Sequence, residues 1–262
     1  MRKIAQLDRR TLLMQMGKGT FALWSEVTFG LGRRGLAIAL GGSGLAAACQ
    51  PIMRPAAQPA AQAGLAAVQY HRVITEFVSA YVLVRGQEIA IVDTGLPNNI
   101  AKFDEAIKGA GLDWNAVGHL ILTHYHADHV GGMSEVLAAA TQSIVYAGAA
   151  DIADIQSPQT IKAVVDGDEV FGLQIIGTPG HTPGHISILD PVGSLLVAGD
   201  ALVQMDGKIA ASPAQFTADM AQAIASVKKL GGLTFEKLVF GHGDPIEQGA
   251  SAAVAELAKT LP

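Results

Sequence analysis

Cysteine is almost absent from this chain of 262 residues, in which Cys49 is the only one. A single thiol cannot form an intramolecular disulfide, so the stability of the fold has to come from packing and from any bound metal. Residues 50–262 contain no cysteine at all, which excludes a cysteine nucleophile from that part of the chain.

Basic residues are scarce beyond residue 48. Residues 1–48 hold seven of the 18 Lys and Arg residues and two of the 23 acidic ones, so the remainder has 11 basic and 21 acidic residues and a net charge of −10. An acidic surface disfavours nucleic acid as a partner, because phosphate binding relies on Lys and Arg. The length permits one or two domains and a sizeable core.

The first 48 residues have the features of an export signal. They begin with basic residues and continue through the apolar run 35–48, and small residues precede Cys49, an order typical of secretory signals. The pair Arg9-Arg10 resembles a twin-arginine export signal, and Ala48-Cys49 resembles a lipoprotein cleavage site, at which the cysteine would carry the lipid. The glycine-rich run 41–44 disfavours the alternative, an N-terminal helix.

These features predict an export signal over 1–48 and a flexible linker over 49–67, where Pro51, Pro55 and Pro59 lie among alanines and glutamines. The protein is expected to be periplasmic or exposed on the cell surface. It would be attached to a membrane only through a lipid on Cys49.

Hydrophobic patterns place strands and helices over the rest of the chain. We expect strands at 68–74, 79–84, 88–92, 120–123, 143–147, 169–171, 173–176, 186–189, 195–198 and 237–240. We expect helices at 99–109, 133–140, 149–156, 213–229 and 251–261.

Residues 120–132 contain the most informative motif. The apolar run Leu120-Ile121-Leu122 ends at Thr123, and three of the eight histidines of the chain, His124, His126 and His129, follow within six residues together with Asp128. Imidazole and carboxylate groups are ligands that zinc prefers. In an extended segment His124 and His126 point the same way and can hold one ion, and Asp128 and His129 are free to face a second. The alternative is a histidine-rich surface loop.

The run 123–129 resembles the His-x-His-x-Asp-His signature of the metallo-β-lactamase fold superfamily. Three further residues of that pattern follow in order, each after an apolar strand: His181, Asp200 and His242. The resemblance covers residues 68–262. It implies an α/β fold, a four-layer αβ/βα sandwich with two mixed β-sheets face to face and helices on both outer faces.

The resemblance also implies two metal ions, zinc first and iron as the alternative. One ion would be held by His124, His126 and His181, and the other by Asp128, His129 and His242, with Asp200 between them. A metal-bound hydroxide would attack the substrate, and Asp128 is the candidate catalytic residue. Asp93, at the end of a strand, would support the metal loop or cap a turn, and His185 is expected to cap or pack rather than to bind metal.

Within the superfamily the motifs are nearest to the lactonase and glyoxalase II-like branches. Asp200 stands where true β-lactamases usually carry Cys or Ser, which disfavours lactam hydrolysis, and His126 in place of Glu argues against the flavodiiron relatives. The nuclease domain of the RNA-processing branch is not found, nor is the C-terminal helical domain of hydroxyacylglutathione hydrolases. The expected function is hydrolysis of an ester, lactone or thioester.

Two alternatives belong to other classes. The chain also resembles the persulfide dioxygenases, in which one iron would be held by His124, His181 and Asp200. The other alternative is a lipoprotein that binds zinc without catalysis.

Overall fold

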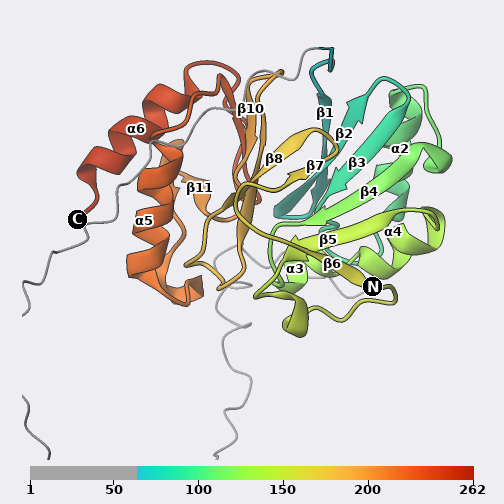
Figure 1. The fold of residues 1–262 in the computed structure, drawn as a ribbon, viewed down its shortest axis with the longest axis horizontal. Helices are drawn as coiled ribbons and strands as arrows, with labels where there is room; N and C mark the ends of the chain where they lie inside the picture. The colour runs from blue at the N-terminus through green and yellow to red at the C-terminus, as the bar shows by residue number, and fades with distance from the viewer. Residues whose placement is uncertain (1–63) are drawn as a thin grey trace, which may run out of the picture. The chain divides into compact units, whose positions relative to one another are not determined.

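The computed structural model describes residues 64–262, which form two β-sheets packed face to face (Figure 1). The predicted export signal over 1–48 and most of the predicted linker over 49–67 lie outside the described residues. Within the described part, no helix is long and apolar enough to cross a bilayer.

The first sheet has six strands in the order of the chain. It contains β1 (Gln69–Thr75), β2 (Val78–Arg85), β3 (Glu88–Val92), β4 (Val117–Leu122), β5 (Ile144–Gly148) and β6 (Ile161–Val164). The pairs β1–β2 and β2–β3 are antiparallel, and the pairs from β3 to β6 are parallel, so the sheet is mixed.

The second sheet has five strands in the order β13-β10-β9-β8-β7. Their bounds are β7 (Glu169–Val170), β8 (Leu173–Gly177), β9 (Ile186–Asp190), β10 (Leu195–Val197) and β13 (Lys237–Val239). The pair β10–β13 is parallel and the others are antiparallel. A separate hairpin joins β11 (Leu202–Met205) to β12 (Lys208–Ala211).

Helices cover both outer faces, as the sequence predicted (Figure 1). On the outer face of the first sheet lie α2 (Ile100–Gly109) and α4 (Met133–Ala139), and on that of the second lie α5 (Met220–Leu230) and α6 (Ala250–Thr260). The short helix α3 (Ala127–Val130) and the 3₁₀ turns η1 (Trp114–Ala116), η2 (Ile152–Asp154) and η3 (Ala214–Phe216) lie in connections. The four layers αβ/βα are therefore confirmed.

The alternation of side chains along each strand builds three hydrophobic layers. In β4, Leu120 and Leu122 pack against Phe103 of α2, whereas Ile121 between them faces the second sheet. Successive residues of a strand point to opposite faces, so a sheet buried on both sides needs a continuous apolar run. This explains why the strand before the metal motif has no polar residue after His119.

Two of the predicted helices are wrong in extent. The stretch 149–156 holds only the single turn η2, and Asp151, which precedes that turn, has a buried side chain that accepts hydrogen bonds from Thr182 and Gly184. The stretch 213–229 contains η3 and then α5, which begins at Met220. Strand β6 and the hairpin β11–β12 were not predicted.

The break before α5 has a tertiary cause. The backbone amides of Ala218 and Asp219 donate to the carbonyls of His181 and Gly180. They are therefore not available for the hydrogen bonds of a helix that would run through these two residues. The Asp219 side chain then accepts from the amide of Gln222 and caps α5. The connection thus runs past the loop that carries His181.

Five strand ends meet at one edge of the sandwich. Strands β3 and β4 run parallel, as do β10 and β13, and β8 runs in the same direction as β10 because each is antiparallel to β9. Backbone hydrogen bonds from Ser79 to Gly241 and from Ile186 to Thr123, both 2.9 Å, join the two sheets at that edge. Loops that follow these strands are therefore brought together although they are far apart in sequence.

Candidate metal centre

Three histidine rings converge at this edge and form the first cluster. His124 Nε2 lies 3.1 Å from His126 Nδ1, and His181 Nε2 lies 3.2 Å from His124 Nε2 and 2.9 Å from His126 Nδ1. His124 and His181 are buried and His126 is half-buried. Three ring nitrogens therefore face one point, as in a site with three histidine ligands.

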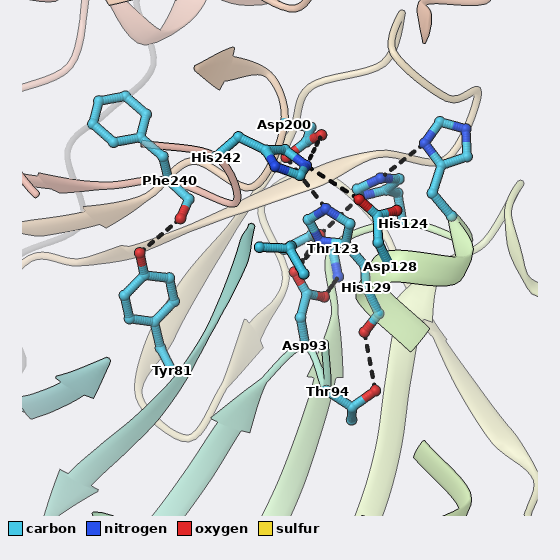
Figure 2. Close-up of polar contacts among 12 residues, drawn as sticks. Tyr81, Asp93, Thr94, Thr123, His124, Asp128, His129, Asp200, Phe240 and His242 are labelled. Atoms are coloured by element: carbon cyan, nitrogen blue, oxygen red, sulfur yellow. Dashed lines mark hydrogen bonds and ion pairs between the residues drawn. The ribbon is translucent and has the colours of Figure 1, made fainter. Parts of the chain in front are cut away.

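A second cluster contains Asp128, His129 and His242, whose ligand atoms all lie within 4.8 Å of one another. The His242 Nε2 atom is 3.3 Å from Asp128 Oδ2. Figure 2 shows Asp128 extending from α3 toward His242, with His129 beneath them.

Asp200 lies between the two clusters. Its Oδ1 is 3.4 Å from His129 Nε2, and its Oδ2 is 3.3 Å from His242 Nε2 and 3.6 Å from His181 Nε2. One carboxylate thus contacts the rings of both clusters. This is the placement required of a ligand that bridges two ions.

The second ring nitrogen of each of three histidines has a hydrogen-bond partner that fixes the ring. Thr123 Oγ1 donates to Asp93, so it can accept from His124 Nδ1 at 2.9 Å. His129 Nδ1 lies 2.8 Å from Asp93 Oδ2, and His242 Nδ1 lies 3.2 Å from the carbonyl of Phe77. With the proton on Nδ1, each Nε2 presents its lone pair to the cluster.

Asp93 is the residue that ties the metal motif to the first sheet. It has a positive φ of 58°, is 2% exposed, and accepts from the backbone amide of Thr123 at 2.7 Å, from its hydroxyl at 2.8 Å and from His129 Nδ1. Figure 2 shows its carboxylate below His129 and Thr123. Of the two roles considered for Asp93, the geometry is that of a support for the metal loop.

Two supporting residues were not found from the sequence. Ser212, at the end of the hairpin β11–β12, lies with its hydroxyl 2.7 Å from His181 Nδ1. Asp151 accepts from Thr182 and Gly184, both at 2.5 Å, and so holds the loop that carries His181. Neither belongs to a motif, and no pattern in the sequence marks them.

Burial and charge divide the histidines into two groups. Burial lowers the pKa of His181 to about 4, and it holds the pKa of His124 well below its ordinary value. At His242 burial also acts to lower the pKa, but the Asp200 and Asp128 carboxylates outweigh it and raise the pKa to about 10. Without metal, the first cluster is therefore neutral at pH 7, whereas His242 is a cation paired with carboxylates, and a bound metal ion would take the place of its Nε2 proton.

The donor atoms fit a divalent cation. Among the described residues, His129 Nε2 and Asp200 Oδ1 are buried polar atoms without a hydrogen-bond partner, although buried polar groups are nearly always satisfied. Both point into the centre, and the neutral nitrogens of the first cluster face one another at about 3 Å. Positive ions would satisfy all of these lone pairs together.

The centre is open on one side. The side chains of His242 and Asp128 are 29% and 22% exposed, while those of His129 and His181 are 0% and 2% exposed. A small molecule can therefore reach the centre past Asp128 and His242. The buried side faces the sheets.

Comparison with known proteins places the chain in a family. Residues 73–242 match the model of the metallo-beta-lactamase superfamily, and the chain belongs to that superfamily. It is a metal-dependent hydrolase, as its curated relatives indicate by their names.

Two curated relatives and one solved structure illustrate the likeness. A probable metallo-hydrolase, YflN of Bacillus subtilis, is 28% identical over 75% of this chain and 92% of its own length. A hydroxyacylglutathione hydrolase of Rhodospirillum rubrum is 33% identical over 58% of this chain and 56% of its own length. The crystal structure of TTHA1623 in a di-iron-bound form has a TM-score of 0.58 and 26% identity, covering 70% of this chain and 96% of that one.

The structure brings together every residue that the sequence proposed as a ligand. These are His124, His126, Asp128, His129, His181, Asp200 and His242. Their assignment to individual ions, and the catalytic role of Asp128, remain predictions. The family and the clusters support a divalent-metal site.

Proposed function

We propose that the protein hydrolyses an ester, lactone or thioester at a pair of zinc ions. His124, His126 and His181 hold one ion, and Asp128, His129 and His242 hold the other. The observation that carries the proposal is the position of Asp200, whose two oxygens contact rings of both clusters. A carboxylate so placed suits two ions a few ångströms apart.

The ions would supply Lewis-acid chemistry, because a bound divalent metal lowers the pKa of water to near 7 and polarises a carbonyl oxygen. The chain supplies the geometry. Burial acts to raise the pKa of Asp128, but His242 beside it outweighs burial and lowers the pKa overall. Asp128 is therefore ionised at neutral pH and lies on the open side, where its Oδ1 can accept a proton from water or orient it.

Two observations favour esters, lactones and thioesters over lactams. One relative is named as a hydrolase of hydroxyacylglutathione, which is a thioester. Asp200 occupies the position at which true β-lactamases usually carry Cys or Ser.

The test combines metal analysis with a substrate panel. The full chain is loaded with zinc, its metal content is measured, and its rates on lactones, thioesters, simple esters and β-lactams are compared. We expect two zinc equivalents and turnover of at least one oxygen ester, lactone or thioester, with much slower turnover of β-lactams. The matched control is Asp113→Ala, because Asp113 is an exposed carboxylate that caps η1 away from the centre.

Other outcomes would identify the alternatives. One iron per chain with oxygen uptake on a persulfide would replace the proposal with a dioxygenase. Two zinc equivalents without turnover of any substrate in the panel would indicate a zinc-binding protein that is not an enzyme.

We also propose that the protein is exported and attached to a membrane through a lipid on Cys49. The support is the basic start, the apolar run 35–48 and the small residues before Cys49. Cys49→Ala should move the protein from the membrane fraction to the soluble fraction. A wild-type protein that is already soluble and carries no lipid would refute the proposal.

A further inference from the structure

His185 lies beside the centre without belonging to either cluster. It is 1% exposed, and its ring lies 5.2 Å from that of His124 and 5.9 Å from that of His181, centroid to centroid. Its Nε2 accepts a hydrogen bond of 3.0 Å from the backbone amide of Asp200. Its ring is therefore used to hold the backbone of the proposed bridging residue.

A chain of hydrogen bonds leads from the other side of the ring back to the same turn. His185 Nδ1 lies 2.8 Å from Thr178 Oγ1, which lies 3.0 Å from Ser187 Oγ, and Ser187 Oγ donates to the carbonyl of Ala198 at 2.9 Å. The turn 198–200 is thus bound at its first carbonyl and at its last amide.

The two ends of this series of hydrogen bonds determine which group donates and which accepts at every step. The Asp200 amide can only donate, so Nε2 must be unprotonated and Nδ1 must carry the proton. The Ala198 carbonyl can only accept, so Ser187 donates to it and accepts from Thr178, which in turn accepts from His185. Every group in the chain is satisfied in this single arrangement, which fixes both the tautomer of His185 and the position of the turn.

The turn needs such support because its backbone is constrained. Gly199 has a φ of 56°, and a Cβ placed on it would lie 2.8 Å from His185 Nε2 and 2.9 Å from Thr123 Cβ. Glycine is therefore required for the close approach of the turn to the ring. The turn sets the point from which the Asp200 side chain reaches both clusters.

We propose that His185 is a positioning residue for metal binding, which holds the Asp200 carboxylate between the two ions through the backbone amide of Asp200. Removal of the acceptor leaves a buried amide unpaired. The turn 198–200 then gains free energy by moving to a position where the Asp200 amide finds another acceptor. Such a movement displaces the Asp200 carboxylate and weakens binding of the more weakly held ion. The inference rests on the proposed two-ion centre and is independent of the substrate.

The test measures affinities rather than activity. Zinc affinities of the wild type, His185→Leu and His185→Gln are measured by competition with a chromophoric chelator, and cobalt(II) spectra report the ligand geometry. An unpaired buried donor costs about 1–3 kcal/mol, which corresponds to about 5- to 150-fold in an equilibrium constant. We expect His185→Leu to bind the second zinc equivalent about 5- to 150-fold more weakly than the wild type. The first zinc equivalent should be less affected, and the cobalt spectrum should change.

His185→Gln is the conservative variant, because its Oε1 can accept from the Asp200 amide, and it should recover most of the affinity. His119→Leu is the matched control. His119 is a half-buried histidine on β4 whose ring packs against Tyr146 and Phe171. Its substitution should change thermal stability without changing either zinc affinity.

Three outcomes would overturn the inference. The first is wild-type affinity for both equivalents in His185→Leu, and the second is equal losses in His185→Leu and His119→Leu. A wild type that binds fewer than two equivalents would remove the two-ion centre and this inference together. If His185→Leu does not fold, Thr178→Val provides the same test from the other side of the ring, because it removes the acceptor of Nδ1.

Discussion

The substitution Asp93→Asn tests how the first sheet supports the metal centre. The asparagine has the same shape, and its one oxygen can still accept from the amide of Thr123. Its amide group, however, would face the Thr123 hydroxyl and His129 Nδ1, which both donate to Asp93 in the wild type. His129 can then be satisfied only if its proton moves to Nε2, the atom that faces Asp200.

The size of the effect follows from these contacts. A protonated Nε2 cannot bind a metal, and loss of the partner that orients a ligand histidine typically reduces metal affinity 10- to 100-fold. We therefore expect Asp93→Asn to bind the second ion about 10- to 100-fold more weakly. Asp93→Ala should in addition lower the free energy of unfolding by about 3 kcal/mol or more, because it leaves three buried donors without an acceptor.

The assay has two parts. Chelator competition gives the affinities for each metal equivalent, and urea unfolding of the metal-free protein gives the stability. Asp113→Ala is the control, since it removes an exposed cap of η1 and should cost about 1 kcal/mol of stability and no metal affinity. If Asp93→Asn bound both ions as tightly as the wild type, the proposed role of the Asp93–His129 hydrogen bond would be wrong.

Three further perturbations probe other parts of the molecule. Gly241→Ala should abolish binding of the second ion in metal analysis, because the added Cβ would overlap the Asp200 carboxylate; retention of two ions would contradict the geometry. The raised pKa of His242, about 10 against an ordinary 6.5, adds stability to the metal-free protein that is complete below pH 6.5 and is lost as the pH rises toward 10. The stability that the metal-free wild type has over a His242→Gln variant should therefore be larger at pH 6 than at pH 9 in urea unfolding, and an equal difference at both pH values would contradict this reasoning. Arg85→Ala should cost about 3–5 kcal/mol in urea unfolding, because it leaves the 1%-exposed Asp190 carboxylate without its cationic partner; a loss below 1 kcal/mol would show that the ion pair is not important for stability.

The sequence alone determined the strands that end at the metal centre and the order of the ligands along the chain. Leu120-Ile121-Leu122 is buried on both faces, and such a run is recognisable because local hydrophobicity suffices to identify it. The seven ligand candidates could be named because each lies just after an apolar strand and within a motif. The layered fold followed from that same pattern and from the resemblance that the motifs carry.

Only the tertiary structure decided which polar residues support these ligands. Ser212 contacts His181 and Asp151 contacts Thr182, each across 31 residues of the chain, and His185 reaches Asp200 through a backbone amide. Contacts of this kind depend on how distant segments pack and leave no periodic signal. The same cause ends the predicted helix 213–229 early, because the amides of Ala218 and Asp219 bind the His181 loop, and long-range hydrogen bonds of this kind override local helix propensity.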